Sequence, residues 1–136
     1  LIIGMKKRES LLWQRIKKLN LKGQIFRIES NTINGIPDCY WLYKGQSIWI
    51  ELKSNDIKNC GLSKYQINWH INHLKNGGNC FILRETLSQS LLQLFKVREA
   101  RTLDILAEGE NSRATLLLHF DKIAWDLGFE ENVFKK

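Results

Sequence analysis

Proline, cysteine and long apolar runs are scarce in this sequence, and each scarcity excludes a class of protein. The 136 residues include one proline, which excludes a collagen-like or proline-rich chain. Apolar residues make up 43% of the chain, which is too many for an intrinsically disordered protein. No apolar run approaches the roughly 18 residues of a membrane-spanning helix, so we expect no association with a membrane.

The cysteines argue against a chain held together by structural zinc or by disulfide bonds. Cys39, Cys60 and Cys80 are odd in number, and none belongs to the C-x-x-C spacing of zinc and redox motifs. Reduced thiols and a cytoplasmic location are therefore the simplest expectation. A length of 136 residues is close to that of an average domain, so we expect a single domain over residues 1–136.

Positive charge is concentrated in the first part of the chain. Residues 1–84 carry 14 Lys or Arg against 5 Asp or Glu, a balance of +9. Residues 85–136 carry 7 against 9, a balance of −2. This asymmetry favours a polyanionic partner for the first region, most often a nucleic acid. Solubility alone is the alternative explanation of the charge.

Residue patterns predict an α/β fold with a small mixed central sheet flanked by helices. Leu12 and Ile16 recur at helical spacing, and Ser63 with Gln66 fits a capping box at the start of a second helix. Lys44-Gly45 separates two apolar runs and predicts a tight hairpin. The expected elements are a helix over residues 6–21, strands over 24–30, 39–43, 46–53 and 80–84, and a helix from residue 63.

The rest of the chain, residues 87–136, is expected to form a mainly helical extension to a core of about residues 6–86. Apolar residues at helical spacing predict a helix over residues 88–101. Its buried face would contain Leu91, Leu92, Leu94 and Phe95. We expect this extension to serve in dimerisation or in DNA recognition.

Hairpin geometry brings two carboxylates together. If Lys44-Gly45 is a two-residue loop, Tyr43 pairs with Gln46, and Asp38 then lies directly opposite Glu51. Directly opposed residues have Cβ atoms about 4.5–5.5 Å apart on one face of the sheet. Two like charges at this distance repel each other unless a cation lies between them, and hard carboxylate oxygens suit Mg²⁺.

Two segments around these carboxylates resemble the signature of the PD-(D/E)XK nucleases. They are Gly35-Ile36-Pro37-Asp38 and Ile50-Glu51-Leu52-Lys53. Within that superfamily the chain most resembles the small stand-alone virus-type replication-repair nucleases, the VRR-NUC family, of phages. The resemblance covers roughly residues 9–85. It implies a restriction-endonuclease-like core in a protein of the bacterial or phage-infected cytoplasm.

The resemblance implies a metal-dependent deoxyribonuclease that hydrolyses phosphodiester bonds. Asp38 and Glu51 would bind Mg²⁺, with Mn²⁺ able to replace it, and the backbone carbonyl of Leu52 would be a third ligand. Lys53 would hold the attacking water and stabilise charge on the phosphate.

Two further residues have the positions that the family gives to a helical Glu and a helical Gln. Glu9 would be an additional metal ligand, and the alternative is an exposed residue in a frayed first turn. Gln66 would be a catalytic residue, and the alternative is a capping residue without a catalytic role.

Structure-specific cleavage of branched or four-way-junction DNA suits the compact chain best. Symmetric cleavage would require a homodimer or higher homo-oligomer, which the Leu-rich segment after Glu85 could build. The alternatives are a sequence-specific homing or restriction-type endonuclease and, less favoured, a non-catalytic nucleic-acid-binding module. We expect Trp41, Trp49 and Trp69 in the core or at an interface rather than against bases. The candidate contacts to DNA phosphates are Arg27, Lys44, Lys58 and Lys64.

Overall fold

The structure, a computed structural model, describes residues 2–29 and 33–135. Its helices are α1 (Ile2–Lys17), α2 (Lys64–Lys75) and α3 (Arg113–Asp126), with one short 3-10 helix, η1 (Lys58–Gly61). Its strands are β1 (Gln24–Arg27), β2 (Cys39–Tyr43), β3 (Gln46–Ser54), β4 (Asn79–Glu85), β5 (Leu91–Val97) and β6 (Leu103–Glu110). Ser30, the end of the first expected strand, lies outside the described residues. Within them, no helix is both long and apolar enough to cross a bilayer.

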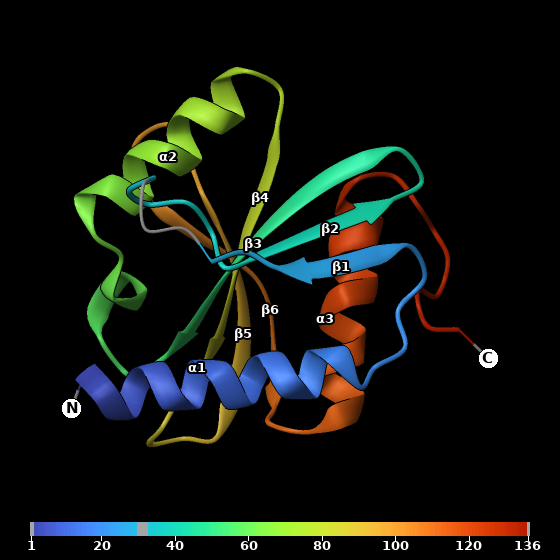
Figure 1. Ribbon diagram of the computed structural model, residues 1–136, viewed down its shortest axis with the longest axis horizontal. Coiled ribbons are helices and arrows are strands. Elements are labelled where there is room, and N and C mark those ends of the chain that lie inside the picture. Colours follow the sequence, from blue (N-terminus) through green and yellow to red (C-terminus); the bar gives the residue numbers. More distant parts are fainter. Residues whose placement is uncertain (1, 30–32, 136) are drawn as a thin grey trace.

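The six strands form one mixed sheet in the order β1-β2-β3-β4-β5-β6. Neighbouring strands are antiparallel except for β3 and β4, which are parallel and are connected through η1 and α2. Figure 1 shows α1 and α2 on opposite sides of this sheet. The prediction of a mixed α/β fold with flanking helices is confirmed.

Alternation along the strands divides the core into two parts. On β3, Ile48 and Ile50 enter the larger core, which α1 and α3 cover with residues such as Ile16 and Phe120. A smaller cluster on the other face lies under α2, where Ile71 packs with side chains of β4 and β5. The face that carries the smaller cluster also carries the intervening β3 residues Trp49 and Glu51.

The β2–β3 hairpin has the predicted two-residue turn. Lys44 and Gly45 have φ angles of 49° and 78°, both in the left-handed region that the tight hairpin turn requires. Tyr43 pairs with Gln46 and Cys39 with Ile50, which confirms the predicted register.

The region after residue 87 is not mainly helical, and the prediction of a helix over residues 88–101 is wrong. Residues 91–97 form β5, which lies between β4 and β6 with both faces covered. Leu92 and Leu94 enter the larger core, whereas Phe95 and Val97 enter the smaller one. A strand buried on both faces has adjacent apolar residues, so its pattern imitates the apolar face of a helix.

Candidate active site

The hairpin register places Asp38 and Glu51 against each other at the open end of β2 and β3. They are the next pair after Cys39 and Ile50, and Asp38 lies near enough to raise the pKa of the Glu51 carboxyl. Asp38 Oδ2 also accepts a hydrogen bond of 2.8 Å from the backbone N–H of Leu52. The predicted adjacency of the two carboxyl groups is therefore present in the folded chain.

Gln66 joins this pair to Lys53. Its Nε2 donates to Glu51 Oε1 at 2.7 Å, and its Oε1 accepts from Lys53 Nζ at 3.3 Å. The same Oε1 accepts from the backbone N–H of Ser63 at 2.9 Å, and the Ser63 hydroxyl caps α2 in return. Gln66 thus both completes the capping box and contacts two candidate catalytic side chains, so the two interpretations of Gln66 are compatible.

Glu51 is only 1% exposed, and both its burial and the negative charge beside it affect the pKa of its carboxyl group. Burial raises the pKa of the Glu51 carboxyl well above its usual range. Hydrogen bonding and the negative charge of Asp38 raise this pKa further. The positive charge of Lys53 lowers it, and the negative charge of Glu9 raises it slightly. Glu9 therefore lies near enough on α1 for its charge to act on the pair.

The donor set suits a divalent cation with oxygen ligands. No ion pair joins Asp38 or Glu51 to a cationic side chain within residues 2–29 and 33–135. In the same ranges no group of three or more His, Cys, Asp or Glu residues is arranged to hold a metal ion. Mg²⁺ commonly binds through one or two carboxylates and keeps several waters, so Asp38 and Glu51 suit it without a third side chain.

A close backbone contact at Gly35 helps to assemble the site. Gly35 has a φ of +83°, and a Cβ on it would collide with the backbone of Tyr65 in the first turn of α2. The loop before Asp38 can therefore approach the helix that carries Gln66. The glycine of the Gly-x-Pro-Asp segment is the sequence signal from which this contact could have been expected.

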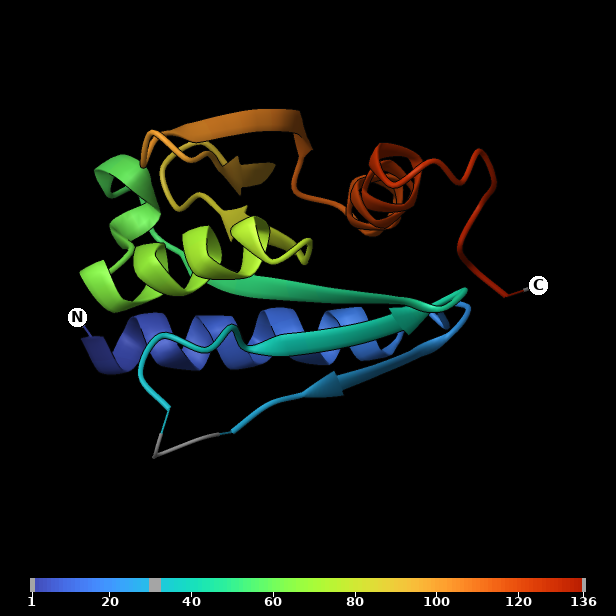
Figure 2. The same cartoon turned by 90° about the horizontal axis from the view of Figure 1, so that it is seen from above.

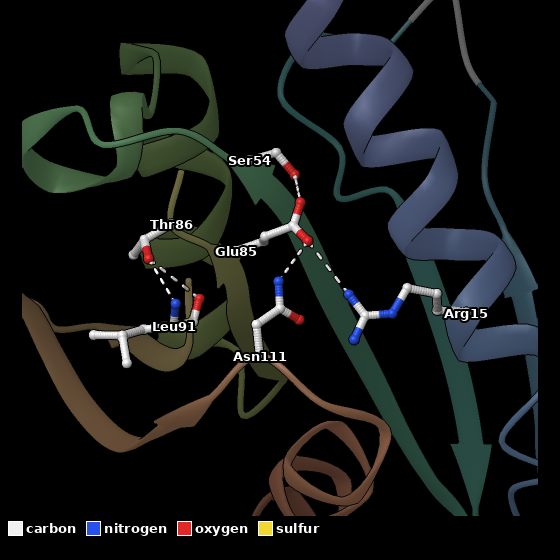
Figure 3. Close-up of polar contacts among 6 residues, drawn as sticks. All are labelled: Arg15, Ser54, Glu85, Thr86, Leu91 and Asn111. Carbon is white, nitrogen blue, oxygen red and sulfur yellow. Dashed lines mark hydrogen bonds and ion pairs between the residues drawn. The ribbon is translucent and has the colours of Figure 1, made fainter. Parts of the chain in front are cut away.

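A second polar cluster lies at the ends of β3 and β4 and was not expected from the sequence (Figure 3). The Glu85 carboxylate accepts hydrogen bonds from Ser54 Oγ at 3.1 Å and Asn111 Nδ2 at 2.8 Å. Arg15 of α1 forms an ion pair with the same carboxylate at 3.3 Å. This Glu85 cluster (Arg15, Ser54, Glu85 and Asn111) fixes the strand next to the site against α1 and the turn before α3.

The four basic residues proposed to contact phosphates are divided between separate parts of the surface. Lys58 and Lys64 are exposed between β3 and the first turn of α2, close in sequence to Gln66. Arg27 instead donates to Ser10 of α1, on the opposite face from Glu51. Lys44 pairs with Glu131 at the closed end of the hairpin. Lys58 and Lys64 thus lie near Gln66 in sequence, and Arg27 pairs in register with Cys39, the neighbour of Asp38, while Lys44 lies at the far end of the hairpin.

A cavity of about 640 Å³ between β6 and α3 lies away from these residues. Its walls include Leu118, Trp125 and Glu108, and none of the candidate catalytic residues. The carboxyl pair is thus not part of this hollow. No protein-family model matches the chain, and no curated protein is significantly similar to it in sequence.

Proposed function

We propose that this protein is a metal-dependent DNA endonuclease of the PD-(D/E)XK superfamily, with a restriction-endonuclease-like fold. The observation that supports this proposal most directly is the group of side chains at the open end of the hairpin. Two carboxyl groups, an amine and an amide meet there through the Gln66 hydrogen bonds to Glu51 and Lys53. Phosphodiester hydrolysis uses such a combination to bind a cation, orient water and stabilise negative charge.

Asp38, Glu51 and the Leu52 carbonyl would hold Mg²⁺, and Glu9 of α1 would add its charge from the neighbouring helix. The bound cation would polarise the scissile phosphate and lower the pKa of its water. Mn²⁺, which also prefers oxygen ligands, would serve in its place.

Lys53 and Gln66 would perform the remaining steps at the phosphate. The Lys53 ammonium would stabilise the negative charge that grows on the phosphoryl oxygens, and would orient the attacking water. Through its two hydrogen bonds, Gln66 would hold the Lys53 amine and the Glu51 carboxylate in fixed positions relative to each other. Attack of water forms one P–O bond while the opposite P–O bond breaks, which leaves a phosphomonoester and a free hydroxyl. No covalent enzyme intermediate is required.

We further propose that the substrate is branched DNA, cut by a homodimer in the cytoplasm. The later part of the chain carries a net charge of −2, which is unfavourable for reading bases in a DNA groove. Leu118 and Trp125 of α3 are instead exposed apolar residues suited to contact a second copy. A symmetric dimer would present two active sites to the two strands of a junction.

Cleavage by the wild type and by Asp38→Asn would test the proposed activity. The panel would contain linear duplex, supercoiled plasmid, a splayed-arm DNA and a four-way junction, each with Mg²⁺ or Mn²⁺. Asp38→Asn keeps a side-chain acceptor for the Leu52 N–H but loses the charge, so we expect loss of cleavage with DNA binding retained in Ca²⁺.

Glu108→Gln offers a matched control, because Glu108 is an exposed carboxylate on β6. This variant should cleave as the wild type does. Unchanged cleavage by Asp38→Asn would exclude the proposed site. Metal-independent binding without any cleavage would favour the binding-module alternative, and discrete cuts in linear duplex would favour a restriction or homing enzyme.

A further inference from the structure

Among the described residues, no helix covers one face of the sheet at β1 and β2 (Figure 2). On this face α2 packs over β4 and β5, and Figure 2, seen from the side of α2, shows β1 and β2 extending beyond it. The strand register places Phe26, Tyr40 and Trp49 side by side there. Phe26 keeps 47% of its surface exposed, and Tyr40 and Trp49 are half-buried.

Four aromatic side chains form a continuous row on this face, the aromatic row (Phe26, Tyr40, Trp49 and Trp69). Ring centroids are 6.2 Å apart for Phe26 and Tyr40, 5.0 Å for Tyr40 and Trp49, and 5.2 Å for Trp49 and Trp69. Trp69 belongs to α2 and stacks on His73 at 4.5 Å. The row therefore runs from the edge strand β1 to the helix that carries Gln66.

The aromatic row adjoins the carboxyl pair. Tyr40 follows Asp38 by two residues, and Trp49 precedes Glu51 by two residues. Two residues of a strand span about 7 Å, and side chains two apart share one face. A nucleic-acid strand with a phosphate at Asp38 and Glu51 would therefore carry its neighbouring nucleotides over the aromatic row.

Charge on this face is compatible with a polyanion. On β1, β2 and β3 the register places one acidic residue on this face, the site residue Glu51, and Asp38 adjoins it at the start of β2. Lys53 lies beside the pair, and Lys64 is exposed at the start of α2. Charge complementarity therefore favours a nucleic acid over an acidic protein surface as the occupant of this face.

A small hollow of about 210 Å³ lies at the α2 end of the row. Trp69, Asn72, His73 and Asn76 line it. A flat aromatic wall beside amides can both stack on a base and bond to its edge.

We infer that the aromatic row binds unpaired bases next to the scissile phosphate, so that the substrate is DNA with single-stranded nucleotides at the cut site. This inference rests on the proposed nuclease function, because it takes the carboxyl pair as the point of cleavage. Bases of any sequence stack on aromatic side chains, whereas bases of an intact duplex already stack on each other. The row therefore selects splayed, flapped or frayed branches over continuous duplex.

Binding of a fluorescein-labelled oligodeoxythymidine, measured by anisotropy in Ca²⁺, tests the row without requiring cleavage. Phe26→Leu and Tyr40→Leu should each weaken binding about tenfold, because stacking on one base is lost. Ile105→Ala is the control, since Ile105 is 51% exposed on β6 and lies outside both the row and the proposed dimer contact. It should bind as the wild type does, and thermal melts would verify that all three variants fold.

Cleavage of a splayed-arm DNA and of the matching duplex separates the row from the nuclease proposal. Row variants should lose splayed-arm cleavage by a similar factor and leave any duplex cleavage unchanged. If both row variants bind the oligonucleotide as tightly as the wild type does, the inference is wrong. It is also wrong if light scattering shows a dimer that Phe26→Asp dissociates, because the row would then be a contact between two copies. Row-dependent binding with no cleavage of any DNA would support the row and exclude the nuclease.

Discussion

Glu51 and Glu85 lie near the ends of the adjacent parallel strands β3 and β4, yet their surroundings differ. Glu85 receives two neutral hydrogen bonds and the Arg15 ion pair, which tie the two halves of the chain together. Glu51 receives one amide hydrogen bond and faces a second carboxyl group. A buried carboxylate stabilises a fold only when donors and cations surround it.

Under the proposed function, the difference separates a structural carboxylate, Glu85, from a functional one, Glu51. In the later region, Asp126 pairs with Lys96 and Asp104 pairs with Arg98. At Glu51 the fold instead retains repulsion that an added cation would relieve. Sites that reduce stability in this way are typical of catalysis.

The same substitution at both residues would sharpen this comparison. Glu51→Gln should reduce cleavage about a thousandfold and raise the free energy of unfolding by about 1 kcal/mol, because it removes a buried like charge. Glu85→Gln should keep most of the cleavage activity and lower the free energy of unfolding by about 2 kcal/mol, because Arg15 loses its partner.

Urea unfolding of the two variants, with cleavage of the splayed-arm DNA measured in parallel, would check this prediction. Both variants preserve side-chain size, remove the charge and exchange one acceptor oxygen for a donor amide, so each controls for the other. Parallel losses of stability at the two positions would remove the distinction between a functional and a structural carboxylate.

The structure around Glu51 could be predicted from the sequence better than the structure around Glu85. The hairpin followed from Lys44-Gly45, and its register then placed Asp38 opposite Glu51. Such local rules suffice where one turn determines which residues meet. Ser63 and Gln66 likewise marked the start of α2 through a local capping motif.

Long-range packing decided the features that the sequence did not reveal. β5 has apolar residues on both faces because α2 and α3 cover opposite sides of it. The local sequence of β5 does not show that helices from elsewhere in the chain pack on both of its faces. The Glu85 cluster combines Arg15, Ser54 and Asn111 from distant segments. Trp41 lies in the core as expected, whereas Trp49 and Trp69 are half-buried because α2 covers only part of the sheet.

Two buried histidines, His70 and His119, should affect the pH dependence of stability to different extents. His70, 2% exposed on α2, has no hydrogen-bond partner for either ring nitrogen among the described residues, and burial followed by the charge of His73 lowers its pKa to about 4. Burial also lowers the pKa of His119 on α3, but His119 Nε2 is bonded to the Leu92 carbonyl, which opposes the effect.

Acid should therefore destabilise the protein mainly through His70. The unfolded chain binds a proton at the ordinary pKa of about 6.5, whereas the folded chain resists it, so stability falls as the pH decreases toward 4. The loss is at most about 2 kcal/mol at pH 5. Denaturant melts at pH 7 and pH 5 should show a smaller difference for His70→Met than for the wild type, and His119→Leu should reduce it less. An equal reduction in both variants would contradict the assignment to His70.

The helix caps give the smallest expected effect and the cleanest separation of stability from activity. Ser63 caps α2 and Ser112 caps α3, each accepting a backbone hydrogen bond three residues on. Replacement of either serine by Ala should lower the free energy of unfolding by about 1 kcal/mol. Only Ser63→Ala loosens the turn that holds Gln66 against Glu51 and Lys53, so only this variant should also cleave DNA more slowly. A loss of positioning worth about 1 kcal/mol corresponds to cleavage that is about fivefold slower. Equal cleavage by the two variants at equal loss of stability would show that the capping box does not position Gln66 for catalysis.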